Sequence, residues 1–172
     1  MILFFTALMC WIAGFTRTVE TGDISLFLNG HQQNYPEEFY YLTLQKCNST
    51  SEWSIHGLWP NYGNGSYPEY CETGVHYDPA VISNTTLHDM ESDWYTCKID
   101  STNENFWDHE ISKHYTCVFS KGWTQEDYFS NGIDLYWKSI SSKAVHDHCK
   151  GDNECMIPWD TTLTYILWDL NQ

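Results

Sequence analysis

Basic residues are scarce in this chain. Its 172 residues include 8 Lys and Arg against 23 Asp and Glu, a formal net charge of −15 with the eight histidines neutral. Nucleic-acid binders usually carry a basic face, so this balance argues against a partner held mainly through phosphate contacts. Aromatic residues, by contrast, make up 17% of the chain. So many large apolar side chains exclude a disordered acidic tail and indicate a folded domain.

Long hydrophobic runs are also missing, except at the N-terminus. Residues 1–15 (MILFFTALMCWIAGF) are apolar and precede the first charged residue, Arg17. This run is short for a membrane span and is typical of a secretory signal peptide, which we predict over residues 1–16. A buried N-terminal helix or strand is the alternative. Because linkers, repeats and later membrane-length runs are absent, we expect residues 17–172 to form one domain with no membrane attachment.

The cysteines contain no C-x₂-C pair, which excludes a zinc ribbon. Cys10 would leave with the signal peptide. An even number in a secreted chain predicts three disulfides, with fifteen possible pairings that the spacing leaves open. Three N-x-[ST] sequences, at Asn48, Asn64 and Asn84, are candidate glycosylation sites and fit the same route. The six remaining cysteines are Cys47, Cys71, Cys97, Cys117, Cys149 and Cys155.

Aromatic and β-branched runs predict strands near both ends of the domain. We expect the second of them to stop at Gly57 and Pro60, and a long loop tied by Cys71 to occupy residues 61–79. The predicted strands are Phe39–Gln45, Trp53–His56, Met156–Trp159 and Leu163–Trp168.

Helices are predicted between these strands. One is capped by Thr85 or Thr86, and a second runs from near Asn105 to His114. In the third, Thr124 and Asp127 resemble a capping box. Strands, then helices, then strands indicate an α+β fold, with a mainly antiparallel central sheet packed with several helices and stapled by disulfides. The third helix presents an apolar stripe of Phe129, Ile133, Trp137 and Ile140.

Titratable side chains gather around His56 and between His109 and His114. Glu110, Lys113 and His114 lie three or four residues apart and share one helix face, with His109 at its margin. The zinc motif H-E-x-x-H is excluded because the second histidine comes one residue late, roughly 140° around the helix from the first. We therefore expect no metal and no cofactor. The segment 146–149 (HDHC) is interpreted as exposed loop residues and a disulfide cysteine rather than a metal tract.

Two histidines, a lysine and a glutamate suit phosphodiester cleavage through a neighbouring hydroxyl. That reaction needs a base for the hydroxyl proton, an acid for the leaving oxygen, and cations around the phosphorane. One imidazole can be neutral while the other is charged, because the ordinary histidine pKa lies near 6.5. A merely solvated helix face is the plainer interpretation of the same residues.

Two segments resemble the active-site motifs of the ribonuclease T2 family, the acidic transferase-type endoribonucleases. They are Trp53–Pro60 (WSIHGLWP) and Phe106–Cys117 (FWDHEISKHYTC). The resemblance covers residues 39–137 and extends more loosely through Cys155. It implies a secreted enzyme that cuts single-stranded RNA without metal and leaves 2′,3′-cyclic phosphate ends.

The resemblance also implies roles for individual residues. His114 would be the general base and His56 the general acid. Glu110 and Lys113 would stabilise the pentacovalent state, and His109 would bind the phosphate. The first base pocket would contain Trp59, Asn61 and Tyr67, and a second base would stack on Phe106. The implied disulfides are Cys71–Cys117, Cys149–Cys155 and Cys47–Cys97.

Three positions depart from the family pattern. Ile111 replaces the usual Trp, which looks like a packing substitution. Tyr115 replaces the usual Gly, and we expect it to shift the base or narrow the cleft. Asn61 replaces the Asp of many members, which implies a different base preference because an amide donates as well as accepts.

The expected protein is a monomer that holds no stable nucleic-acid complex. It is secreted, or delivered to a lysosome-like acidic compartment, where protonated histidines remove about half of the net negative charge. The alternative is a secreted binding or signalling effector on the same fold, with secondary or lost ribonuclease activity.

Overall fold

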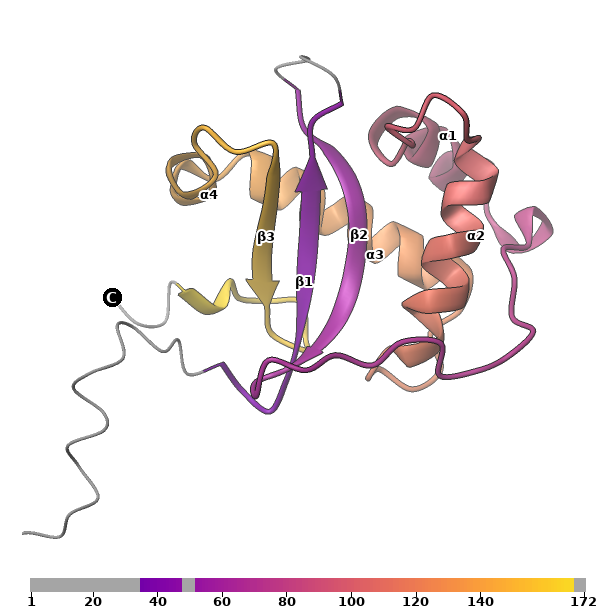
Figure 1. The fold of residues 1–172 in the computed structure, drawn as a ribbon, viewed down its shortest axis with the longest axis horizontal. Coiled ribbons are helices and arrows are strands. Elements are labelled where there is room, and N and C mark those ends of the chain that lie inside the picture. Colours follow the sequence, from indigo (N-terminus) through magenta and orange to yellow (C-terminus); the bar gives the residue numbers. More distant parts are fainter. Residues whose placement is uncertain (1–34, 48–51, 169–172) are drawn as a thin grey trace, which may run out of the picture. The chain divides into compact units, whose positions relative to one another are not determined.

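The computed structural model describes residues 35–47 and 52–168 (Figure 1). The predicted signal peptide and the sequon at Asn48 lie outside these residues. The described part is an α+β fold with a three-stranded antiparallel sheet in the order β2-β1-β3. The strands are β1 (Glu38–Gln45), β2 (Ser54–Tyr62) and β3 (Glu154–Trp159). The helices are α1 (Asn84–Asp93), α2 (Asn103–Lys113), α3 (Gln125–Ile140) and α4 (Lys143–His148), with 3₁₀ turns at Pro79–Val81 and Tyr115–Cys117.

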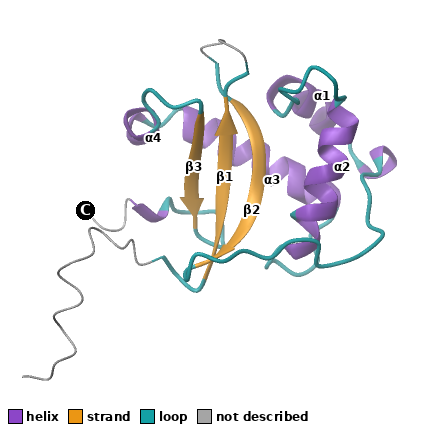
Figure 2. Ribbon diagram, in the orientation of Figure 1, coloured by secondary structure: helices purple, strands orange, loops and turns teal. Residues whose placement is uncertain are grey.

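The central strand β1 explains why the core forms where it does. Its residues Tyr40, Leu42, Thr43 and Leu44 are all fully buried, so both faces of the strand are covered. Helix α3 packs against β1 and β2 and also contacts α1 and α4. Figure 2 shows α1 and α2 beyond the β2 edge of the sheet and α4 beside β3. The predicted α+β class and antiparallel sheet are therefore confirmed.

Strand β2 is longer than the sequence predicted. We expected it to stop at Gly57 and Pro60, but it continues through both residues to Tyr62. The prediction was wrong because β2 lies at the edge of the sheet, where a proline can sit without breaking a ladder between two neighbours. The predicted loop accordingly begins after Tyr62, and the bridge Cys71–Cys117 ties it to the turn after α2.

Two helix predictions need correction. Helix α1 is capped by Ser83 rather than by Thr85 or Thr86, which lie within its first turn. In α3 the Thr124–Asp127 capping box is present, but the predicted apolar stripe is only partly buried. Its Trp137 is 54% exposed and its Ile140 37% exposed. The buried face of the second half of α3 runs instead through Leu135, Tyr136 and Ser139.

The chain after α3 also differs from expectation. His146 and His148 are exposed, as predicted, but they lie on the short helix α4, whose cap at Ser142 the pattern analysis missed. Residues 163–168 were predicted as a strand and contribute only one bridge, between Trp159 and Ile166. A turn held by Asp160, whose carboxylate accepts from the backbone N–H groups of residues 162, 164 and 165, prevents a longer pairing.

Three disulfides staple the described residues. They pair Cys47 with Cys97, Cys71 with Cys117, and Cys149 with Cys155, which are the pairs that the family resemblance implied. Within residues 35–47 and 52–168, each helix falls short of the length and apolar character that a bilayer span requires.

Candidate active site

One pocket of about 320 Å³ gathers the predicted site residues from β2, the loop that follows it and the C-terminal half of α2. Phe106 is the predicted residue that does not line it, although its ring centroid lies 5.8 Å from that of His56. Two lining residues, Pro60 and Met156, were not predicted. The predicted lining residues are His56, Trp59, Asn61, Tyr67, His109, Glu110, Lys113 and His114.

His56 occupies a β-bulge in β2. Thr43 of β1 pairs with Gly57, while the next residue of β1, Leu44, pairs with Ile55, which leaves His56 without a partner in the register. A bulge redirects the side chain of the extra residue. The His56 carbonyl accepts a 3.1 Å hydrogen bond from the indole of the buried Trp94, so the bulge is fixed from the helical side as well.

Helix α2 directs Glu110 toward the sheet. Thr102 caps its first turn, and the buried residues Trp107, Glu110 and Ile111 form the face that packs inward. The indole of Trp107 donates a 2.6 Å hydrogen bond to the carbonyl of Trp94. Ile111 is fully buried, which agrees with a packing role for this departure from the family pattern.

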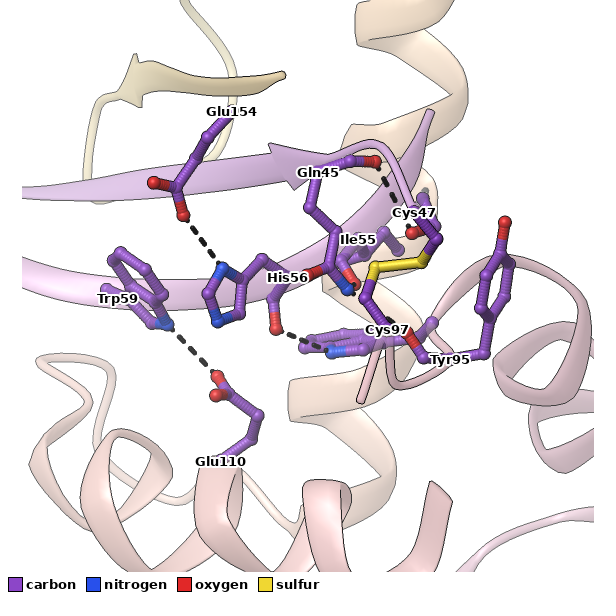
Figure 3. A network of polar contacts seen from close by, with 11 residues as sticks. Gln45, Cys47, Ile55, His56, Trp59, Tyr95, Cys97, Glu110 and Glu154 are labelled. Atoms are coloured by element: carbon purple, nitrogen blue, oxygen red, sulfur yellow. Dashed lines mark hydrogen bonds and ion pairs between the residues drawn. A yellow bond between two sulfur atoms is a disulfide. The ribbon is translucent and has the colours of Figure 1, made fainter. Parts of the chain in front are cut away.

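Glu110 is a fully buried carboxyl group in the pocket wall. Its Oε2 accepts a 3.0 Å hydrogen bond from the Trp59 indole (Figure 3), while its Oε1 has no partner among the described residues. Burial raises the pKa of Glu110 to about 8, against the opposing effects of the Trp59 hydrogen bond and the Lys113 charge. The group is therefore protonated in acid and can donate a hydrogen bond to a substrate oxygen.

His114 lies at the C-cap of α2 and is only 5% exposed. Its ring stacks on Trp59, with centroids 5.0 Å apart and planes 20° apart, and its Nδ1 has no hydrogen-bond partner among the described residues. Burial, together with the nearby Lys113, His109 and His56, lowers the pKa of His114 to about 3. This imidazole therefore stays neutral, and able to accept a proton, even in mild acid.

Lys113 and the loop after β2 close the other side of the pocket. The ammonium of Lys113 lies 3.5 Å from a carboxylate oxygen of Glu69, and the backbone N–H of Tyr70 donates to the Lys113 carbonyl. His109 lies exposed at the rim, and partial desolvation of its ring together with the Lys113 charge lowers its pKa. The pocket therefore combines one ammonium with imidazoles of different exposure.

Two residues that depart from the family pattern, Tyr115 and Asn61, differ in whether they line the pocket. Tyr115 does not line this pocket; its hydroxyl donates a 2.8 Å hydrogen bond to the Trp123 carbonyl, so the expected narrowing of the cleft is wrong. Asn61 does line the pocket, and its amide nitrogen donates to the Trp59 carbonyl at 2.9 Å. One amide N–H is thereby engaged within the protein, and the carbonyl oxygen remains as an acceptor.

The family assignment follows from comparison with known proteins. The model of the ribonuclease T2 family matches residues 27–152. The chain belongs to the ribonuclease T2 family. Ribonuclease 1 of Arabidopsis thaliana is 38% identical over 107 residues, which cover 58% of this chain and 46% of that protein. Extracellular ribonuclease LE of Solanum lycopersicum is 38% identical over 86 residues, or 49% and 37% of the two chains.

The fold of this T2-family chain also matches a solved structure. The crystal structure of RNase NT in complex with 5′-AMP aligns with a TM-score of 0.56 at 22% sequence identity, over 77% of this chain and 89% of that one. The match shows a shared fold. The present chain covers about half or less of the length of the two curated relatives above.

Three side chains of the T2-family site lie closer together than their helical spacing predicts. Donor atoms of His109, Glu110 and His114 all lie within 4.8 Å of one another, although a regular helix would separate the two histidines by roughly 140°. They converge because His114 is the C-cap, where the helix ends. A cation placed there would meet the Lys113 charge, which already acts on all three groups.

The sequence analysis missed Glu154 of β3. Its Oε1 lies 2.8 Å from Nδ1 of His56 (Figure 3). Pattern alone offered no signal for this contact, because it depends on β3 pairing with β1 more than 100 residues away in the sequence. The matched family segment ends at residue 152, just before this glutamate.

Stability of this T2-family protein should be greatest in mild acid. Below pH 6.5 the unfolded chain protonates His114 while the folded protein does not until about pH 3, so stability falls as pH falls. Above pH 4.5 the unfolded chain ionises Glu110 while the folded protein keeps that proton until about pH 8, so stability falls as pH rises. The two opposite slopes offset each other between pH 4.5 and 6.5.

Urea unfolding across a pH series measures this effect. Glu110→Gln should flatten the decline between pH 6.5 and 8 by up to a few kcal/mol and leave the acid side unchanged. A wild type and a Glu110→Gln variant with parallel pH profiles would contradict the buried, protonated state of Glu110.

Proposed function

We propose that this protein is a metal-independent endoribonuclease that cleaves single-stranded RNA by transphosphorylation, leaving a 2′,3′-cyclic phosphate. One observation carries the proposal. A buried, neutral His114 and a carboxylate-bound His56 line the same pocket, beside the ammonium of Lys113 and the buried carboxyl of Glu110. Two imidazoles in such different environments can divide the roles of base and acid.

The proposed reaction moves two protons. His114 takes the proton of the ribose 2′-hydroxyl, and the 2′-oxygen attacks phosphorus. The bond from phosphorus to the 5′-oxygen then breaks, and the Nε2 proton of His56 passes to that oxygen. Lys113 and the protonated Glu110 stabilise the charge of the pentacovalent state, and His109 binds the phosphate. The 2′-hydroxyl requirement makes the enzyme specific for RNA over DNA.

Bases would be bound by the aromatic residues near the pocket. Tyr67 is 56% exposed and can offer its face to a base, together with Trp59 and Asn61. Phe106 would stack a second base. Stacking of this kind tolerates different sequences, and the net charge of −15 disfavours long-range attraction to RNA. We propose that a monomer binds briefly, cuts and releases, without a stable nucleic-acid complex.

The location is part of the same proposal. Secretion fits the apolar N-terminus, the three disulfides and the sequons, of which Asn64 and Asn84 are exposed. An acidic destination fits the low pKa of His114, because the base then remains neutral there. One relative is named as an extracellular ribonuclease.

The test is cleavage of an RNA strand and of the DNA strand of the same sequence at about pH 5 in EDTA. We expect the RNA to be cut and the DNA to remain intact. Metal-dependent chemistry at the His109–Glu110–His114 cluster would instead stop in EDTA. The alternative, a binding or signalling effector with lost activity, predicts no cleavage of either strand at any pH.

A further inference from the structure

We propose that Glu154 is a positioning residue that holds the Nδ1 proton of His56 and so leaves Nε2 as the nitrogen that gives its proton to the substrate, an inference that rests on the proposed function. Its Oε1 accepts a 2.8 Å hydrogen bond from Nδ1 of His56. The two residues come from β3 and β2, the opposite edges of the sheet, and their side chains point toward one another across β1 (Figure 3). The bulge at His56 and the length of the glutamate together allow the contact.

The Glu154 side chain must span a long distance to contact His56 across β1. Two inter-strand spacings separate β2 from β3 by about 10 Å. Glu154 and Ser54 both pair with Gln45, so the glutamate starts level with the beginning of β2 rather than with His56 itself. An aspartate at residue 154 would fall short by one carbon–carbon bond, about 1.5 Å.

The backbone around Glu154 is fixed on both sides. The loop before it is closed by the disulfide Cys149–Cys155, whose cysteines are 2% and 4% exposed. Lys46 also anchors this loop, because its backbone N–H donates to the Asn153 carbonyl at 2.9 Å and its ammonium to the Asp152 carbonyl at 3.1 Å. The backbone therefore sets the point from which the half-exposed Glu154 side chain reaches His56.

The other groups that face His56 do not replace Glu154 as the hydrogen-bond acceptor for its Nδ1. Trp59 of β2 and Phe106 of α2 approach the ring with their own rings, at centroid distances of 5.0 and 5.8 Å. The electrostatic effect of His56 contributes to the lowered pKa of His109 and of His114, which lie at the C-terminal end of α2. Among the hydrogen bonds of the described residues, the Nδ1 of His56 has Glu154 as its partner.

The hydrogen bond determines which nitrogen does chemistry. With its Nδ1 proton held by Glu154, His56 can lose only the Nε2 proton, which passes to the departing 5′-oxygen. The neutral ring that remains is already in the Nδ1–H tautomer and can take a proton back at Nε2 when water later opens the cyclic phosphate. Without Glu154 the ring is free to rotate and to adopt the other tautomer.

The test compares substrates that differ in their need for the acid. A dinucleoside monophosphate expels an alkoxide, which must be protonated, whereas a nucleoside 3′-(4-nitrophenyl phosphate) expels a phenolate, which leaves without help. We expect Glu154→Ala to lower kcat on the dinucleotide by about 10- to 100-fold with little change in KM, and on the aryl ester by less than about twofold. Glu154→Gln, whose amide oxygen can still accept from Nδ1, should retain more activity than Glu154→Ala.

Asp152→Ala is the matched control, because it removes a carboxylate from the same disulfide-closed loop without touching His56. It should match the wild type on both substrates. The ¹⁵N shifts of His56 should also change from the Nδ1–H tautomer in the wild type to a mixture in Glu154→Ala. Equal losses on the two substrates, or an unchanged tautomer, would overturn the role of Glu154. A wild type inactive on both substrates would instead overturn the proposed function, and this role with it.

Discussion

Replacing His114 with alanine should lower kcat/KM for RNA by about 10²- to 10⁴-fold, the usual contribution of a general base. The loss should appear on the dinucleotide and on the aryl ester alike, because both reactions must deprotonate the 2′-hydroxyl. His56→Ala should differ by losing far more on the dinucleotide than on the ester. This contrast assigns the base and the acid from kinetics alone.

Circular dichroism and urea unfolding should show that His114→Ala still folds. The buried Nδ1 of His114 has no hydrogen-bond partner in the described chain, so its removal leaves no new unsatisfied group. His88→Ala is the control, because His88 is exposed on α1 and away from the pocket. Cleavage by His114→Ala at the wild-type rate would exclude His114 as the base.

Gly57→Ala should remove most of the activity and also destabilise the protein, by about 1–3 kcal/mol as is usual for overpacking. A Cβ at this position would lie 2.0 Å from Nε1 of Trp59 and 2.2 Å from Oε2 of Glu110. The added methyl group therefore occupies the place of the hydrogen bond between those two side chains. Trp59 and Glu110 must move apart, and Trp59 also stacks on His114.

Kinetics on the dinucleotide together with urea unfolding check this expectation. Gly74→Ala adds the same methyl group where nothing lies within 4 Å, at a residue with φ +77°, so it carries only a local backbone cost of about 1 kcal/mol. It should keep its activity when folded. A Gly57→Ala variant as active and as stable as the wild type would show that the Trp59–Glu110 contact is dispensable.

Local patterns predicted much of this fold. The aromatic and β-branched run at 39–45 became β1, and Thr124 and Asp127 cap α3 as expected. Errors arose where tertiary position overrides local preference. Pro60 is tolerated because β2 is an edge strand. Trp137 stays exposed because the buried face of α3 runs through Tyr136 and Ser139 on either side of it. Neither fact is present in the order of the residues.

The candidate site also combines residues that local spacing predicted with one that it could not predict. Spacing placed Glu110, Lys113 and His114 together because one helix carries them, and the structure brings all three to one pocket. Spacing missed Glu154, since its contact with His56 depends on the pairing of β3 with β1. The opposite pKa changes of Glu110 and His114 also depend on burial that only the folded chain creates.

The most direct test of the central claim is the first phosphorus product released from a dinucleoside monophosphate in EDTA at about pH 5. We predict that ³¹P NMR shows a 2′,3′-cyclic phosphate before any 3′-monophosphate, in wild type and not in His114→Ala. Direct appearance of a linear phosphate, or loss of cleavage in EDTA, would contradict a reaction carried by the two histidines.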